Sequence, residues 1–568
     1  MAAGFEPARR LPAYTLSRRA PSSARAGHRA ECTESLSTSA ARPLRVIAVA
    51  AGLGSGISTR HRRLILGLVV LCGAAARTLP LLVANGPQAT SIFDEGIYLS
   101  AAGVFSEGWM PYRDFAFLHP PSILLLLQPL TALAHGPFGW DDALVVGRWV
   151  GVALGTANIV LIALLAQRWR GWVAGVVAAT LYATNGPAIG IDRHILLEPA
   201  VAAAVLCSAL LWLPSSDGVS TRRAVGAGAL VGLAATIKLT GGLAIVGILL
   251  ADRIRSRWRQ RAAAVGAAVA VIALIVVPFV LVAGVGEVWR LVIETQMERP
   301  GGDVIGGSLM SLRERLRHLT LFGVLNVAAV PGVLRLVAVV AVVVALGWAW
   351  VRGGRHGRFW AAVSVVTCLA VLIAPDYYDQ YGASVAPQIA IVLAAGVVAS
   401  LEYLRRYRDV IVRAAAVALV AVLAAGIGVV LRSQIVTLRS GAPDMGALFR
   451  AQLGPGDCVS SDAPYLVIAA DRLPQPDATG GPLVDPFGEM LAIALEHSST
   501  WPSTSAALLG EPAQHRLRIA LAACSHVVLT ARPEDHVRFT ADTARWFTER
   551  YALVLDGRDR PTLWVRRA

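Results

Sequence analysis

Long apolar segments constrain the fold of this chain more than any other feature. Several runs of about 20 residues carry almost no charge, which is the length a helix needs to cross a bilayer. Hydrophobic residues make up 55% of the sequence, and charged residues only 16%, against about 25% in typical soluble domains. The sequence therefore predicts a polytopic α-helical membrane protein. Disorder, a coiled coil and a purely soluble enzyme are excluded.

Hydropathy predicts eleven spans, and two of them, on either side of Lys238, are short and form a broken pair. The spans are 64–84, 143–166, 171–189, 195–213, 224–237, 239–251, 262–284, 330–351, 359–374, 384–404 and 410–431. A further apolar run, 121–135, has only 15 residues and contains Pro129. Because spanning needs about 20 residues, we expect this run to lie in the membrane interface.

The distribution of arginine predicts the orientation. Loops on one side hold 18 arginines and three acidic residues: 60–63, 167–170, 214–223, 252–261, 352–358 and 405–409. Loops on the other side hold 7 arginines and 14 acidic residues: 85–142, 190–194, 286–320 and 375–383. Arginine-rich loops mark the cytoplasm, so the N-terminus is predicted inside and the C-terminus outside. This topology accounts for the net charge of +15 without nucleic acid as a partner.

Composition divides the chain into three predicted domains. Residues 1–60 read as a disordered, basic cytoplasmic tail, or as an extension upstream of the true start. Residues 61–431 form the membrane domain, with a large first outer loop at 85–142. Residues 432–568 are polar and Pro-rich and are predicted to form a small extracytoplasmic α/β domain. Its expected elements are strands at 458–462, 526–530, 552–557 and 562–567, and a helix at 540–551.

The six cysteines show no C-x-x-C spacing, so no zinc or redox motif is readable. Cys458 and Cys524 are the two cysteines of the predicted outer domain, and each lies at or just before a predicted strand. Adjacent parallel strands would bring them close enough for a disulfide in an oxidising compartment. The alternative is two buried free thiols that pack as small hydrophobic side chains.

Polar residues that suit chemistry are concentrated on the predicted outer face. In the first outer loop, Asp94 and Glu95 open an amphipathic stretch, and Tyr112, Arg113 and His119 follow. Further along, polar residues gather at the outer ends of later spans: Arg193, Glu198, Lys238 (the one lysine of the chain), Tyr377, Tyr378 and Tyr381. Ionisable groups at membrane depth indicate a functional site. Carboxylates, bases and tyrosines on one face would suit a substrate with an anionic head and a sugar.

Each of these candidates also has a purely structural interpretation. Asp94 and Glu95 could cap a solvated helix, and Arg113 could form a local ion pair with Asp114. Lys238 could be a snorkelling anchor at the end of a span. The three tyrosines could belong to an interfacial aromatic belt.

The residues of the first outer loop resemble those of a known family. Asp94-Glu95 after the first span, Pro-Tyr-Arg-Asp-Phe at 111–115 and His-Pro-Pro at 119–121 resemble the membrane-embedded GT-C glycosyltransferases. The likeness covers about 64–431 and is greatest to the branch of protein O-mannosyltransferases and aminoarabinose transferases, which use polyprenyl-phosphate sugars. Many relatives carry lysine where this chain has His119.

Later segments resemble the actinobacterial members of that branch. They are Arg193 with Leu-Glu-Pro at 197–199, the junction at Lys238 and the tyrosines at 377–381. In the C-terminal tail, Ser461-Asp462 and Val-Asp-Pro-Phe-Gly at 484–488 are similar to tails of the same members.

The resemblance implies an inverting transfer of a mannose-type or arabinose-type sugar from polyprenyl phosphate to an acceptor hydroxyl. Asp94 is then the base, and Glu95 orients it or shares its role. Arg193, His119 and Lys238 are implied to hold the phosphate. The acceptor would be a lipid, glycan or protein of the cell envelope. No cofactor is required by these residues, although outer-loop carboxylates could bind a divalent metal.

Two other functions remain open. A transporter or flippase would move a lipid-linked sugar without chemistry, and such proteins often show two related halves. No such repeat is visible here, and the large first loop and single outer tail favour an enzyme. The third possibility is a non-catalytic glycan-assembly protein that keeps the fold.

Overall fold

The computed structural model describes eleven stretches of the chain. They are 58–82, 92–136, 138–214, 218–252, 257–300, 315–316, 332–375, 377–404, 445–498, 500–556 and 561–568. The N-terminal tail up to residue 57 and the last predicted span, 410–431, lie outside these residues.

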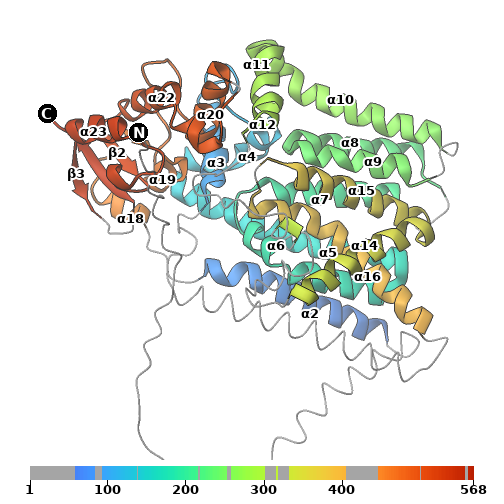
Figure 1. Ribbon diagram of the computed structural model, residues 1–568. Coiled ribbons are helices and arrows are strands. Elements are labelled where there is room, and N and C mark those ends of the chain that lie inside the picture. The colour runs from blue at the N-terminus through green and yellow to red at the C-terminus, as the bar shows by residue number, and fades with distance from the viewer. Residues whose placement is uncertain are drawn as a thin grey trace, which may run out of the picture. The chain divides into compact units, whose positions relative to one another are not determined.

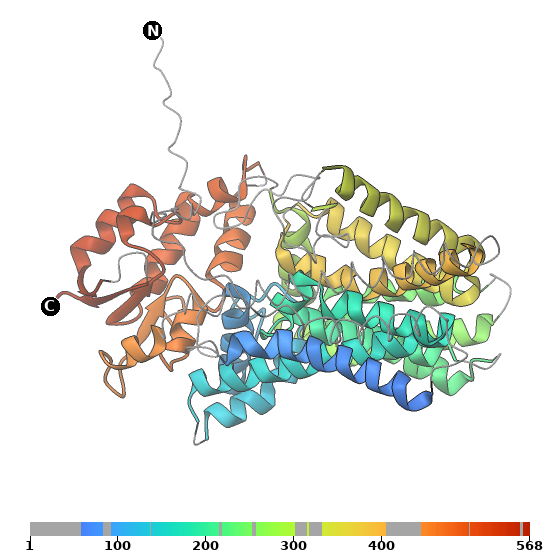
Figure 2. The same ribbon diagram turned by 90° about the horizontal axis from the view of Figure 1, so that it is seen from below.

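Apolar helices packed against one another make up the part of the chain before residue 405 (Figures 1 and 2). They are α2 (Thr59–Thr78), α5 (Trp140–Ala183), α7 (Leu197–Trp212), α8 (Thr221–Ile237), α9 (Ala244–Leu250), α10 (Trp258–Ala283), α14 (Gly332–Arg352), α15 (Gly354–Ile373) and α16 (Asp379–Leu404). Shorter helical turns join them: η1 (Leu79–Leu81), α6 (Gly186–Ile191), η3 (Leu239–Leu243), α11 (Val285–Trp289), η4 (Arg290–Glu294) and α12 (Thr295–Met297).

Within the described residues, five helices are long and apolar enough to cross a membrane: α2 with η1, α5, α10, α15 and α16. Continuous apolar sequence forms helices here because each backbone polar group finds its partner within the helix, which lipid requires. Side chains such as Leu274 and Leu281 of α10 are 76% and 80% exposed, which fits contact with lipid. The predicted polytopic helical fold is confirmed.

The helix α5 contains the predicted span 143–166 and most of the span 171–189, whose last residues lie in α6. Its backbone is non-helical at Arg170 and Gly171, where Gly171 has a φ of 83° that favours glycine. The second half then turns back along the first, because a Cβ on Gly175 would lie 2.9 Å from the carbonyl oxygen of Ala163. The two spans therefore form a tight helical hairpin.

The short spans around Lys238 are α8 and the pair η3 and α9. Lys238 itself has an extended backbone, with φ of −150° and ψ of 131°. The chain then folds back so closely that a Cβ on Gly241 would lie 2.5 Å from the Ala234 carbonyl oxygen. The interruption leaves the side chain of Lys238 at a break between helical segments.

The first outer loop contributes the helices α3 (Phe93–Ser106) and α4 (Ser122–Ala134). With 13 residues, α4 extends about 20 Å at 1.5 Å per residue, short of a bilayer core of about 30 Å. One face of α4 is buried through Leu124 and Leu127 against α3, α5 and α8. The helix is thus part of the core under the site.

The C-terminal part of the chain forms a four-stranded sheet covered by helices. The strands are β1 (Val459–Ser461), β2 (His526–Leu529), β3 (Tyr551–Leu555) and β4 (Thr562–Arg566), in the order β1-β2-β4-β3. β1 and β2 are parallel, and the other two pairs are antiparallel. The helices are α18 (Met445–Arg450), α19 (Pro464–Ala469), α20 (Pro486–His497), α21 (Thr504–Leu508), α22 (Glu511–Leu521), η6 (Pro533–Asp535) and α23 (Ala541–Arg550).

Alternating residues of the sheet supply a core on each face. Val527 and Trp564 pack with Phe547 of α23 on one face, and Val528 packs with Phe449 of α18 on the other. This alternation is what the two-residue period of a strand dictates. All four strands fall on the runs predicted from the sequence. The predicted helix at 540–551 is α23, which begins after Thr540, whose hydroxyl accepts the Thr543 N–H. The small sheet near the C-terminus is thus confirmed.

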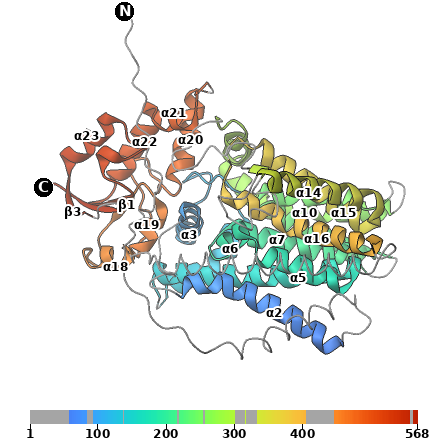
Figure 3. The ribbon, with the colours of Figure 1, turned by 60° about the horizontal axis from the view of Figure 1, so that its bottom comes forward.

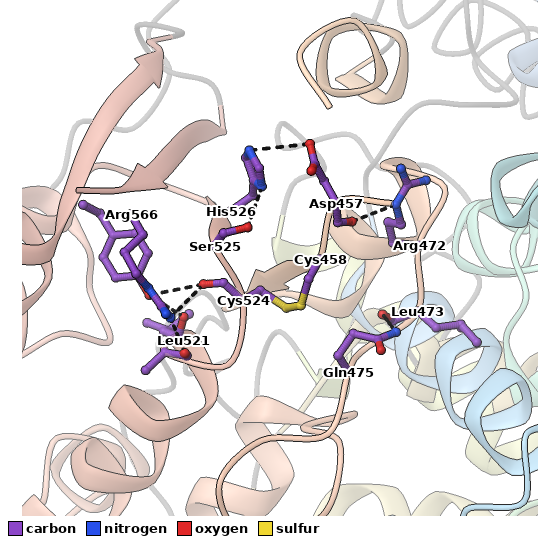
Figure 4. The surroundings of a disulfide bond; sticks show 12 residues. Asp457, Cys458, Arg472, Leu473, Gln475, Leu521, Cys524, Ser525, His526 and Arg566 are labelled. Carbon is purple, nitrogen blue, oxygen red and sulfur yellow. Dashed lines mark hydrogen bonds and ion pairs between the residues drawn. A yellow bond between two sulfur atoms is a disulfide. The ribbon is translucent and has the colours of Figure 1, made fainter. Parts of the chain in front are cut away.

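Cys458 and Cys524 form a disulfide in this domain, with Cα atoms 5.0 Å apart (Figure 4). The parallel pairing of β1 with β2, which opposes Val459 to His526, brings the two cysteines together. The other cysteines within the described residues, Cys72, Cys207 and Cys368, are free.

The helix α3 packs directly on α19 of the C-terminal domain (Figure 3). The contact is between backbones, because a Cβ on Gly96 would lie 2.2 Å from the Tyr465 nitrogen. The backbone N–H of Trp140 also donates to Asp471 Oδ1 at 2.6 Å. The C-terminal domain therefore rests on the helix that carries Asp94 and Glu95.

Candidate functional site

Asp94 and Glu95 occupy the first turn of α3, where negative charge is favoured by the helix dipole. Successive residues of a helix point about 100° apart. The two carboxylates consequently face different neighbours, and their environments differ.

Glu95 is fully buried and is held by the membrane helices. The Nε of Arg148 donates to its Oε2 at 3.1 Å, and a second guanidinium nitrogen pairs with Oε1. His194 Nδ1 lies 3.2 Å from the same Oε2. Burial raises the pKa of Glu95, but the charges of Arg148 and His194 outweigh it and lower the pKa to about 2. Glu95 is an enclosed, permanently ionised anchor for the start of α3.

Asp94 is half-buried and faces the other way. The side-chain amide of Gln380, at the start of α16, donates to its Oδ2 at 3.0 Å. Burial and the charge of Glu198 raise the pKa of Asp94, Lys238 and Arg299 oppose them, and the result is a pKa of about 6. Asp94 can therefore exchange a proton close to neutral pH, as a general base must.

Lys238 and Glu198 form an ion pair close to Asp94. The Nζ of Lys238 lies 2.5 Å from Glu198 Oε1 and 5.0 Å from the centre of the Tyr381 ring. Tyr381 in turn contacts Tyr377 and Tyr378, with ring centres 5.6 and 5.7 Å apart. The structure thus brings together the lysine, the glutamate and the three tyrosines singled out in the sequence.

Arg299, which follows α12, was not singled out in the sequence. Its Nη1 donates to the Tyr378 hydroxyl at 3.3 Å, and its guanidinium lies 5.2 Å from the centre of the Phe487 ring. Its charge lowers the pKa of Asp94 and of His119. Arg299 therefore supplies a second cation to the site.

His119 lies beside the aromatic residues of the loop. Its Nε2 is 3.3 Å from the Tyr98 hydroxyl, and the Tyr112 hydroxyl donates to its backbone oxygen at 2.6 Å. Burial, with the charges of Lys238 and Arg299, lowers the pKa of His119 to about 3. The ring is neutral at physiological pH, so it can meet a phosphate through a hydrogen bond but not as a cation. Tyr112, which is buried, shapes the loop.

Two of the predicted substrate-binding residues lie apart from this group. Arg113 is half exposed and pairs with Asp114 at 2.7 Å, the local ion pair that was its alternative interpretation. Arg193 is half-buried, and it interacts electrostatically with Arg148 and Glu95. The charges that shift the pKa of Asp94 are those of Glu198, Lys238, Arg299 and Glu95.

A small pocket among the membrane helices is lined by Lys238 and Glu198 and by residues of α7, η3, α9, α15 and α16. Its lining also includes the apolar side chains of Val205, Trp360 and Val363. An ion pair beside apolar side chains suits an amphiphile with an anionic head. In the part of the chain that the structure covers, no group of three or more metal-binding side chains is close enough to hold a metal ion.

Residues 117–375 match the family model of Glycosyltransferase family 87. This range includes His119, Glu198, Lys238 and Arg299. No curated protein sequence matches the chain.

Solved membrane enzymes share the whole architecture. ArnT from Cupriavidus metallidurans, bound to undecaprenyl phosphate, superposes with a TM-score of 0.57 at 14% identity, over 90% of this chain and 99% of that one. The oligosaccharyltransferase of Archaeoglobus fulgidus, tethered to an acceptor peptide, gives a TM-score of 0.55 at 12% identity, over 91% of this chain and 75% of that one. The chain has the fold of the GT-C glycosyltransferases.

Identities of 12% and 14% to these structures establish the fold and leave donor and acceptor to be argued from the residues of this chain. The predicted resemblance to the GT-C glycosyltransferases is confirmed, whereas the actinobacterial type remains a prediction. Arg148 and Arg299 belong to the site but had no local motif that could have identified them, whereas Gln380 lies within the Tyr-rich segment at 377–381.

Proposed function

We propose that this protein is a GT-C glycosyltransferase that moves a sugar of mannose or arabinose type from a polyprenyl-phosphate donor to an acceptor hydroxyl. The reaction takes place on the outer face of the cytoplasmic membrane and inverts the anomeric carbon. The observation that carries the proposal is Asp94, a carboxylate with a pKa of about 6 that lies within the field of Lys238 and Arg299.

The donor class is supported by the pocket. Lys238 lines this pocket together with apolar side chains such as Val205 and Val363, a combination that suits a phosphate attached to an isoprenoid chain. Two structural relatives were solved with such lipids: ArnT with undecaprenyl phosphate, and the A. fulgidus enzyme AglB with a dolichol-phosphate.

In the proposed reaction, the acceptor hydroxyl oxygen attacks the anomeric carbon as its proton passes to Asp94. A new carbon–oxygen bond forms, and the bond from the anomeric carbon to the phosphate oxygen breaks with its electron pair. Polyprenyl phosphate leaves, and water later takes the proton from Asp94. Because a single displacement exchanges the face of the sugar ring, the product is inverted.

The arrangement around Asp94 serves this step. Gln380 fixes Oδ2 of the carboxylate, which leaves Oδ1 to receive the proton. Lys238 and Arg299 counter the charge that develops on the leaving phosphate, a stabilisation that grows as the bond breaks. The sequence allowed Glu95 either to orient Asp94 or to share its role as base. We assign it the orienting role, because Glu95 is buried and held by Arg148, away from an acceptor.

The acceptor is proposed to be a hydroxyl of a lipid, glycan or protein of the cell envelope. Tyr377, Tyr378 and Tyr381 lie around Lys238 and can present aromatic faces to a sugar. Tyr381 also positions Lys238 through its ring.

The decisive experiment uses the full-length protein in liposomes. Radiolabelled mannosyl and arabinosyl polyprenyl phosphates are supplied with candidate acceptors, and the label is followed into product and across the bilayer. The proposal predicts label in an acceptor, with inverted stereochemistry by NMR.

The other outcomes identify the rival functions. Label that crosses the bilayer without entering an acceptor would indicate a transporter or flippase. Donor that binds but neither crosses nor reacts would indicate a non-catalytic glycan-assembly protein.

A further inference from the structure

Two motifs of the C-terminal domain that the proposed reaction does not use meet at Arg538. Asp462 belongs to the Ser461-Asp462 pair, and Phe487 to the Val-Asp-Pro-Phe-Gly segment at 484–488. Arg538 Nη1 donates to the Asp462 backbone oxygen at 3.3 Å. Its guanidinium also lies 5.9 Å from the centre of the Phe487 ring.

A buried cluster holds Arg538 in place. The Arg538 backbone N–H donates to His536 Nδ1 at 3.2 Å, so the ring proton of His536 sits on Nε2, 2.9 Å from Asp462 Oδ2. The Thr530 backbone N–H donates to the other oxygen of Asp462 at 2.9 Å. On the opposite side, Gln514 donates to the Arg538 carbonyl at 2.8 Å. The backbone of Arg538 is thereby fixed at both its N–H and its carbonyl.

From this position Arg538 reaches the start of α3. Its guanidinium carbon lies 4.8 Å from the centre of the Phe93 ring, and Phe93 is the residue directly before Asp94. The guanidinium of Arg299 also lies beside Phe487, 5.2 Å from the centre of its ring. Phe93, Arg538, Phe487 and Arg299 form an alternating series, which we call the cation–aromatic series.

The start of α3 depends on such contacts. Ile92, at the N-cap position, makes no side-chain capping hydrogen bond, so the first turn lacks the usual local restraint. Glu95 restrains one side of this turn through Arg148. The cation–aromatic series restrains the other side, where Asp94 lies.

We propose that Arg538 is a positioning residue for the transfer reaction. Through the cation–aromatic series it sets the position of Asp94 relative to Arg299, and thus the distance between the base and the cation that faces the phosphate. The C-terminal domain then completes the site without contacting the reacting atoms. This inference rests on the proposed function for its kinetic consequences, but its structural part stands alone.

The expected effect is on turnover. Because displacing a catalytic group by about 1 Å can slow a reaction about 10²-fold, Arg538→Gln should lower kcat by about 10-fold or more. The donor KM should change by less than about 3-fold, since Arg538 is not among the pocket-lining residues. Arg538→Lys should restore part of kcat, because an ammonium also binds an aromatic face. The matched control is Arg545→Gln, an exposed arginine of the same domain.

A double-mutant cycle tests the route. Phe93→Leu keeps apolar bulk but removes the ring, and it should reproduce the loss of kcat. If Phe93 and Arg538 act through one contact, the double variant should be little worse than either single one. Wild-type kcat in folded Arg538→Gln, or losses that multiply as independent effects, would show the proposal to be wrong. Should Arg538→Gln not fold, Arg538→Lys replaces it in the cycle.

Hydrogen exchange separates this inference from the proposed function. In the full-length protein, amides 92–100 should exchange faster in Arg538→Gln and in Phe93→Leu than in wild type or Arg545→Gln. If the wild type transfers no sugar but this exchange difference is found, the proposed function fails and the positioning contact stands. Unchanged exchange at 92–100 overturns the positioning contact whatever the activity.

Discussion

At the scale of residues, the site depends on the different environments of two adjacent carboxylates. Asp94 and Glu95 are chemically similar, but the turn of α3 points one toward Gln380 and the other toward Arg148. Their pKa values diverge to about 6 and about 2. Titratable pairs whose environments separate their pKa values in this way take different roles, here a base and an anchor.

The first prediction concerns pH. Asp94 must be ionised to accept a proton, so kcat/KM should rise tenfold per pH unit below about pH 6 and level off above it. Initial rates at low donor concentration, between pH 4.5 and 8, measure this limb. A flat profile across that range would exclude Asp94 as the base.

The second prediction concerns the pH at which the rising limb of the kcat/KM profile levels off. The Lys238 charge lowers the pKa of Asp94, so Lys238→Met should raise that pKa and move the limb to higher pH. Donor binding should also weaken, because the pocket loses its cation. Arg60→Met, at an exposed arginine of α2, serves as the control and should leave the limb in place. If the pH profile of kcat/KM is the same in Lys238→Met as in wild type, the charge of Lys238 does not act on Asp94.

At the scale of elements, hydropathy was sufficient for the helices and the break at Lys238, since both are local properties of the sequence. Alternation and capping were sufficient for the four strands and α23. The distant residues that contact the predicted site residues could not be predicted in this way. Arg148 meets Glu95 across 53 positions, and within its own segment it resembles any other arginine at the end of a span. Arg299 could be recognised only after the helices had brought it to Tyr378.

The third prediction concerns the anchoring of α3. Glu95→Gln leaves Arg148 buried with a weakened partner, which typically costs about 3–5 kcal/mol. The thermal midpoint in detergent should therefore fall clearly, whereas Asp142→Asn, at an exposed site, should not change it. Replacing both partners, with Glu95→Leu and Arg148→Met, should recover part of the loss. A midpoint of Glu95→Gln equal to that of wild type would contradict the anchoring role.

At the scale of the whole molecule, the site joins segments from both ends of the sequence. The family match spans 117–375, yet Asp94 precedes it and the C-terminal domain follows it. Gly96 against Tyr465 and Arg450 with Asp141 at 2.7 Å tie these outlying parts together. The C-terminal domain must therefore share the side of the membrane on which the first outer loop lies.

The fourth prediction tests that sidedness. The arginine distribution places Arg257 in the cytoplasm and Thr437 outside. A reporter fused after Arg257 should be active only in the cytoplasm, and one fused after Thr437 only outside. Activity of both on the same side would contradict the eleven-span arrangement and the span predicted at 410–431.

The most direct test of the central claim is the transfer rate of Asp94→Asn. This change keeps the size of the side chain, and the remaining amide oxygen can still accept the hydrogen bond from Gln380. The basic carboxylate is lost. Transfer should fall by about 10²-fold or more, with binding of the polyprenyl-phosphate donor largely kept and Asp142→Asn fully active. Full activity in Asp94→Asn, together with loss in a folded Glu95→Gln, would contradict the account and assign the base to Glu95.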